Sequence, residues 1–187
     1  MGIKIRGTRK GLILALALAA GHVALPAAFA PAALAQVSDV VKIAVDDPSF
    51  LSLAVGGYDV LHNYTAGEFR AEYRSGTKLI FLKPFVGLLG TTDRAFYGYG
   101  GFLTDLYFGS HFVLTPNAAV GYYDNGAGKD LGNHIEFRTG AEFAYRFEDR
   151  SRLGLSFNHI SNAGIGKRNP GEEELGLVFS IPFTLLQ

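Results

Sequence analysis

The chain has 187 residues and a formal net charge of zero, because 17 Lys and Arg balance 17 Asp and Glu. It contains no cysteine, which excludes a disulfide framework and a thiolate metal site. This charge balance gives no indication of nucleic-acid binding, and the length fits one domain.

The first 35 residues have the pattern of a secretory signal peptide. An apolar run from Leu12 to about Ala20 is followed by small residues up to Ala33-Leu34-Ala35. Four basic residues precede the run: Lys4, Arg6, Arg9 and Lys10. A retained membrane anchor is the alternative, but the run is shorter than the ~20 residues that span a bilayer. We therefore predict cleavage before Gln36 and a mature domain, 36–187, with 13 basic and 17 acidic groups.

The mature part has turn residues about every ten positions and no dominant helical period. Its clearest pattern runs from Ile135 to Glu148, where apolar residues such as Phe137 and Phe143 alternate with polar or small ones. A period of two over this length predicts a β-strand with one apolar and one charged face. The same alternation appears at 68–74 and at 112–122.

Applied to the whole mature part, this pattern predicts eight strands. They lie near 50–60, 67–74, 79–90, 95–107, 110–122, 134–147, 152–161 and 173–183. Turn residues separate several of them, as in Asp124-Asn125-Gly126 and Glu148-Asp149-Arg150. We expect Pro84, Pro116 and Pro182 at bulges or strand ends, because each removes one ladder donor. An even number of strands with short connections predicts an all-β fold, an eight-stranded antiparallel transmembrane β-barrel.

The period of two does not say which face of each strand lies inside the barrel. A soluble, lipocalin-like barrel with an apolar interior is therefore an alternative. The Glu and Arg residues at 68–74 and 136–146 could neutralise one another in a narrow polar interior, while aromatic residues face lipid. Small membrane barrels are arranged this way, so we expect the polar face inside.

The seventh predicted strand carries a histidine and a serine on its apolar face. Leu155, Phe157, His159 and Ser161 share this face because they are separated by two residues each. Side chains so placed are ~6–7 Å apart at the backbone, a gap that an imidazole and a hydroxyl can close. His159 and Ser161 are thus candidates for a general base and a nucleophile.

The eighth predicted strand supplies a third member on the same face. Glu173 lies at alternate positions with Leu175 and Leu177 and so shares their face of the strand, whereas Glu172 and Glu174 lie on the opposite face. Because the two strands are hairpin neighbours, Glu173 can orient His159, which would activate Ser161. Taken singly, each residue also has an ordinary structural explanation. The placement of all three on the same apolar face favours a catalytic triad.

These residues resemble the PagL family of lipid A 3-O-deacylases. The resemblance is carried by the run from His159 to Ile165, then Asn169, and Glu173 fourteen residues after the histidine. Upstream it rests on the barrel pattern, the length and the signal peptide. It implies an integral enzyme of the Gram-negative outer membrane whose substrate is lipid A or lipopolysaccharide. The implied triad of His159, Ser161 and Glu173 would hydrolyse the ester-linked 3-hydroxyacyl chain at position 3.

The segment after Ser161 offers candidates for further contacts with the substrate. Backbone N–H groups near Asn162 and Gly164 could stabilise an oxyanion, and Asn169 could help there or hold the loop. Lys167 and Arg168 are candidate contacts for the lipid A phosphates. We expect no cofactor and no metal, since His62, His111 and His134 lack the spacing or carboxylate neighbours of a metal site.

Strand direction places the candidate triad without reference to any family. If both termini are periplasmic, the end of the seventh strand and the start of the eighth lie near the outer surface, where lipid A fills the outer leaflet. Two other functions stay open: a non-catalytic structural or adhesive barrel, and acyl transfer in place of hydrolysis. The sequence also leaves open whether the barrel forms a homodimer and which acyl length it prefers.

Overall fold

The computed structural model describes residues 41–43, 47–62 and 65–186, so the expected signal peptide, 1–35, lies outside the described residues. The strands are β1 (Val41–Ile43), β2 (Phe50–Tyr58), β3 (Ala66–Arg74), β4 (Lys83–Thr91), β5 (Phe96–Leu103), β6 (Leu106–Phe108), β7 (Phe112–Asp124), β8 (Ile135–Arg146), β9 (Arg152–Ser161) and β10 (Glu172–Pro182). A 3-10 turn, Phe183–Leu185, follows β10. Within these ranges no helix is long and apolar enough to cross a membrane.

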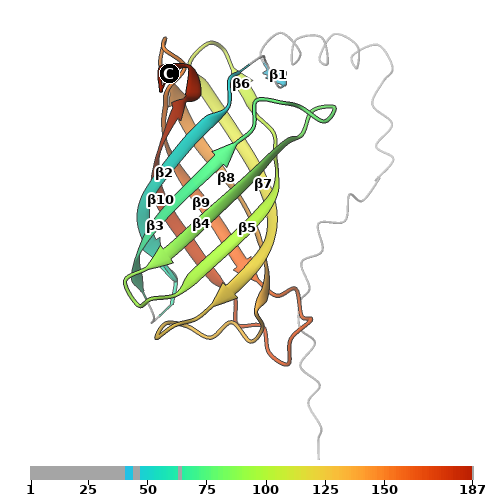
Figure 1. The fold of residues 1–187 in the computed structure, drawn as a ribbon, viewed down its shortest axis with the longest axis vertical. Helices are drawn as coiled ribbons and strands as arrows, with labels where there is room; N and C mark the ends of the chain where they lie inside the picture. The colour runs from blue at the N-terminus through green and yellow to red at the C-terminus, as the bar shows by residue number, and fades with distance from the viewer. Residues whose placement is uncertain (1–40, 44–46, 63–64, 187) are drawn as a thin grey trace, which may run out of the picture.

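Eight of the strands form a closed antiparallel barrel. The order β7-β5-β4-β3-β2-β10-β9-β8 is closed by a further pairing of β7 with β8, as Figure 1 shows. The short strands β6 and β1 extend the sheet at the end where the C-terminus lies. Closure leaves the barrel strands without an unpaired edge, which is what a sheet needs within lipid. The predicted fold class is confirmed.

The strand predicted at 95–107 is divided into β5 and β6, and Pro116 on β7 lies opposite the division. Leu103 pairs with Asn117 and Leu106 with Leu114, so the register continues across the gap. Thr104 N donates to Pro116 O at 3.2 Å, but proline has no N–H to donate in return. The result is an interrupted ladder and not a bulge. Pro84 and Pro182 lie at the second and last positions of their strands.

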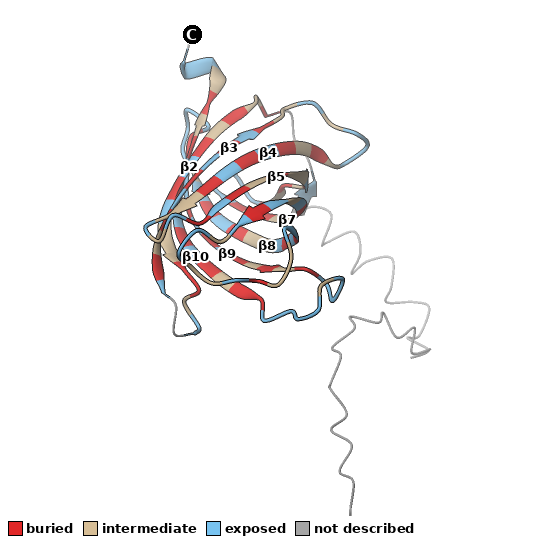
Figure 2. Ribbon diagram, turned by 60° about the horizontal axis from the view of Figure 1, so that its bottom comes forward, coloured by how far each residue is buried: buried red, intermediate tan, exposed pale blue. Residues whose placement is uncertain are grey.

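Buried and exposed residues alternate along the barrel strands (Figure 2). On β3, Glu68, Arg70 and Glu72 are buried inside, whereas the intervening Phe69 is 62% exposed on the outer wall. The outer faces of β9 and β10 are apolar and exposed, with Leu153, Leu155, Phe157, Leu175, Leu177 and Phe179. The interior is therefore polar, and the alternative of a soluble barrel with an apolar interior is wrong.

Ion pairs cross the middle of the interior. Glu174 accepts hydrogen bonds from Arg70 Nη1 at 2.9 Å and from Arg138 Nε at 3.0 Å. Glu72 accepts from Arg74 Nε at 2.9 Å and from the hydroxyl of Tyr99 at 2.7 Å. Glu174 of β10 is thus neutralised by Arg70 of β3 and Arg138 of β8, as expected for a polar interior, because a buried charge is tolerated only with a partner.

A layer of tyrosines fills the interior between this network and the two longest connections of the barrel, 125–134 and 162–171. The hydroxyl of Tyr58 donates to that of Tyr123 at 2.9 Å, and Tyr123 donates to Lys129 O at 2.7 Å. Both tyrosines are buried. The end of β2 and the 125–134 connection are thereby fixed relative to each other.

Loss of the interior network should show in stability. Arg138→Ala leaves the buried Glu174 and Glu72 with one cation fewer, and breaking such a buried network costs about 3 kcal/mol or more. We expect the free energy of unfolding in urea to fall by that amount for the refolded barrel in lipid vesicles. The control is Thr139→Ala, the outward-facing neighbour, which should change little. Equal stability of the two variants would contradict the structural role of the network.

Candidate active site

The β9–β10 hairpin pairs His159 directly with Glu173. Both side chains lie on the outer wall, half exposed and 16% exposed respectively. Glu172 and Glu174, on either side of Glu173, are fully buried in the barrel. The alternation of side chains along β10 thus places three chemically identical residues in two different environments. As the sequence predicted, Glu173 lies on the outer face and its two neighbours lie on the inner face.

His159 and Glu173 are in hydrogen-bonding contact. His159 Nδ1 lies 3.2 Å from Glu173 Oε1. Since a carboxylate only accepts, this contact places the proton of the neutral imidazole on Nδ1 and leaves Nε2 as the basic atom. A histidine held in this tautomer by a carboxylate is the arrangement required of a general base.

Gly171 makes room for the imidazole. A Cβ at this position would lie 2.7 Å from His159 Cε1 and 3.3 Å from Nε2, and the backbone φ of +61° also favours glycine. The antiparallel register pairs Glu172 with Ile160. The next pair along the hairpin would therefore be Gly171 and Ser161. The Nε2 edge of the ring is therefore directed toward the serine end of the hairpin.

Ser161 is the last residue of β9 and is partly exposed on the same face. Among the described residues, no hydrogen bond joins its hydroxyl to His159. The structure brings His159 and Glu173 together and leaves Ser161 two positions along the strand. Hydrogen bonds of catalytic groups are often long without substrate and tighten when it binds.

Asn162 holds the loop that follows the serine. This side chain is fully buried, and its Nδ2 donates to Leu131 O at 2.9 Å and to Arg168 O at 2.8 Å. Its Oδ1 accepts from Gly164 N, and its own backbone N–H donates to Asn169 Oδ1, both at 2.9 Å. The N–H groups of Asn162 and Gly164 are thus used within the loop, and Asn169 holds the loop.

The basic pair of the loop lines a cleft of about 780 Å³ between the connections 125–134 and 162–171. Lys167 and Arg168 are exposed there. Arg168 forms an ion pair with Asp130, whose pKa is lowered by the backbone N–H of Gly132 and by this guanidinium. The charge of Arg168 is therefore paired across the cleft.

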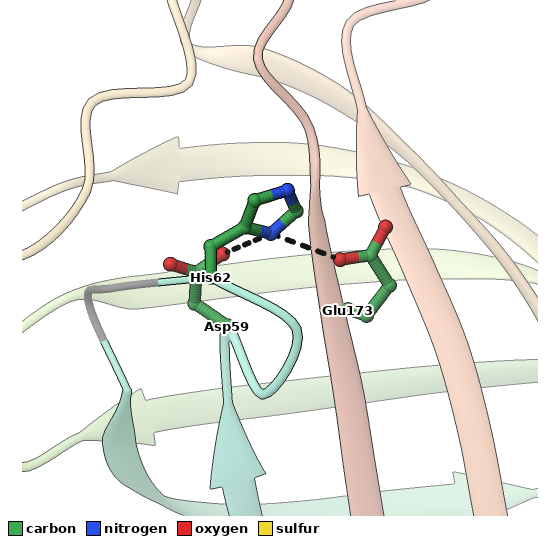
Figure 3. A group of neighbouring side chains, drawn as sticks. All are labelled: Asp59, His62 and Glu173. Carbon is green, nitrogen blue, oxygen red and sulfur yellow. Dashed lines mark ion pairs between the residues drawn. The ribbon is translucent and has the colours of Figure 1, made fainter.

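The prediction that His62 lacks carboxylate neighbours is wrong, and this histidine belongs to the site although no role was predicted for it. In Figure 3 the imidazole lies between Asp59 and Glu173. Its Nδ1 is 3.1 Å from Asp59 Oδ1 and 3.2 Å from Glu173 Oε2. The three groups could in principle hold a cation, because their ligand atoms lie within 4.8 Å of one another. The local signal was Asp59, three residues before the histidine.

A match to a known protein family identifies the family of this chain. The family model described as lipid A 3-O-deacylase (PagL) matches residues 58–182. The chain belongs to the PagL family. The match includes every residue of the site just described, from Asp59 to Glu173. No curated protein matches the chain by sequence.

Solved structures support the same fold. One titled as the crystal structure of the outer membrane enzyme PagL has a TM-score of 0.58 and 18% identity, covering 71% of this chain and 99% of that one. A second, from a study of de novo designed transmembrane β-barrels, has a TM-score of 0.52 and 12% identity, covering 73% and 98%. At these identities the likeness concerns the barrel fold of this PagL-family chain.

The role of Asn162 can be tested by proteolysis. Asn162→Ala removes the hydrogen bonds that tie the loop to Leu131 and Arg168, so we expect trypsin to cut after Lys167 or Arg168 at least about tenfold faster, since local opening is governed by such bonds. Mass spectrometry of the fragments measures the rate. Asn125→Ala, in the neighbouring connection, should keep the cleavage rate of the parent. A resistant Asn162→Ala variant would show that other contacts hold the loop.

Proposed function

We propose that the chain is a lipid A 3-O-deacylase, a carboxylic ester hydrolase that removes the 3-hydroxyacyl chain ester-linked at position 3. The observation that carries this proposal is the contact of His159 with Glu173 on the outer wall of a PagL-family barrel, two residues from Ser161. Lipid A or lipopolysaccharide is the substrate, and no cofactor takes part. The alternative is a non-catalytic structural or adhesive barrel.

In the first step His159 Nε2 takes the proton of the Ser161 hydroxyl, and the serine oxygen attacks the ester carbonyl. The imidazolium so formed is stabilised by Glu173, whose Oε1 already faces Nδ1. Collapse of the tetrahedral intermediate breaks the bond to the sugar oxygen, which receives the proton from His159. The products of this step are deacylated lipid A and an acyl chain on Ser161.

In the second step water attacks the acyl-serine with His159 again as the base. The serine oxygen leaves and regains its proton from the imidazolium, and a 3-hydroxy fatty acid is released. Both tetrahedral intermediates carry an oxyanion that needs a donor. Of the four residues that directly follow Ser161, Asn162, Gly164 and Ile165 have acceptors for their N–H groups, so the N–H of Ala163 is our candidate for this donor.

The position of the triad suits a substrate that stays in the membrane. The face that carries His159 and Glu173 continues along the barrel wall through Leu155, Leu175 and Leu177, where acyl chains can lie. We propose that signal peptide 1–35 directs export, and that this end of the barrel faces the outer leaflet of a Gram-negative outer membrane. Lipid A then enters sideways, with its phosphates near Lys167 at the rim.

Lipid A mass is the test of this function. Expressed in a Gram-negative host without such activity, the chain should convert lipid A to a species lighter by one 3-hydroxyacyl group, and fragmentation should assign the loss to position 3. Ser161→Ala should stop the conversion, since a triad nucleophile contributes on the order of 10⁶ in turnover.

The control for this experiment is Ser110→Ala, in an exposed turn at the opposite end of the barrel. An unchanged lipid A mass with folded, membrane-inserted protein would favour the structural alternative. Lipid A that gains or exchanges a chain would instead show acyl transfer. Activity of Ser161→Ala within about tenfold of the parent would contradict the serine mechanism.

A further inference from the structure

Glu173 is shared by two histidines. Its Oε1 contacts His159 Nδ1 and its Oε2 contacts His62 Nδ1, each at 3.2 Å. The second histidine comes from the turn after β2, far from β10 in the sequence but beside it in the barrel, because β2 and β10 are paired. The carboxylate is thus held from both sides.

His62 is itself held in place by its own turn. Its Nδ1 lies 3.1 Å from Asp59 Oδ1, and its backbone N–H donates to Asp59 O at 3.2 Å. Asp59 is fully buried and has a backbone φ of +56°, a conformation that a residue other than glycine adopts only where its surroundings impose it. The turn is therefore shaped around this aspartate.

Two further contacts tie the turn to β10. Val60 N donates to Glu173 O at 3.1 Å, and Asp59 N donates to Glu172 Oε2 at 3.2 Å. A third contact comes from the connection 125–134, where Lys129 Nζ lies 2.6 Å from Asp59 Oδ1. The residues that position His62 thus belong to three separate parts of the chain.

We propose that His62, held by Asp59, is a positioning residue that orients Glu173 and through it His159. This inference rests on the proposed function and adds a residue outside the expected triad. Both neighbours of His62 Nδ1 are carboxylates, so a proton on this nitrogen is attracted to both of them. The contact limits rotation of a carboxylate that is 16% exposed at the rim, where water would otherwise compete for it.

A divalent cation between Asp59, His62 and Glu173 is the competing interpretation of the same cluster. Against it stands the ammonium of Lys129, which already supplies a positive charge at the oxygen that would bind the metal. A second cation there would be repelled at close range. The arrangement of one imidazole between two carboxylates needs no added ion.

The test uses substitutions at His62 in the full-length, folded barrel, assayed on purified lipid A in detergent. His62→Ala should lower kcat about tenfold or more with little change in KM, because the imidazole that orients Glu173 is lost while no contact to the substrate changes. His62→Asn should restore much of the rate, since its amide nitrogen can take the place of Nδ1. His62→Gln should not, because its amide reaches the position of Nε2.

Two controls separate a positioning role from general damage. His111→Ala, an exposed histidine at the opposite end, should keep the activity of the parent. In a Glu173→Ala background, His62→Ala should have no further effect, because it acts through that carboxylate. NMR of ¹⁵N-labelled histidine should also show less of the Nδ1-protonated tautomer of His159 in His62→Ala.

Several results would overturn the proposal. A normal kcat and an unchanged His159 tautomer in His62→Ala would contradict it. If Ser161→Ala and Glu173→Ala are still inactive in that case, the proposed function stays intact. Equal rates for the Asn and Gln variants would also contradict it. Loss of wild-type activity on treatment with a chelator, restored by Zn²⁺ or Ca²⁺ alone, would establish the metal interpretation instead. Activity in Glu173→Ala would count against the proposed function itself.

Discussion

Closure of the strand ladder is the constraint on which the remaining structure depends. Lipid offers a backbone no hydrogen-bond partner, so each spanning strand must be bonded on both sides, and the pairings of β2 with β10 and β7 with β8 complete the circle. Because side chains alternate along a strand, closure also gives every strand an inner and an outer face. The narrow interior is then stable only if its charges are paired, as Glu174 is with Arg70 and Arg138.

The same alternation separates the candidate site from the interior. Of three consecutive glutamates, two belong to the buried interior and only Glu173 reaches the outer wall, where the register sets it against His159. Closure then brings the turn after β2 next to this carboxylate. A rigid, paired scaffold thus presents polar groups on an apolar wall, which is the placement that a membrane-bound substrate requires.

Much of this arrangement could be predicted because it follows from local pattern. The strand predicted at 152–161 has the bounds of β9. The face of β10 on which Glu173 lies follows from the period of two. The break between β5 and β6 could not be predicted, because it depends on the register of β7, which places Pro116 opposite the gap between the two strands. The contact of His62 with Glu173 could not be predicted, although Asp59 precedes the histidine by three residues. It depends on the positive φ of Asp59 in the turn after β2, and the period of two does not extend into that turn.

We propose that Ser161 is a nucleophile activated through His159 by Glu173. A fluorophosphonate probe, which reacts with activated serines, tests it directly when the labelled residue is identified by mass spectrometry and its labelling rate is measured. We predict label on Ser161, a rate lower by on the order of 10⁴ in Glu173→Gln, and a rate near that of the parent in folded Glu174→Gln. Label on a different serine, or labelling of Ser161 at the parent rate in Glu173→Gln, would contradict the account.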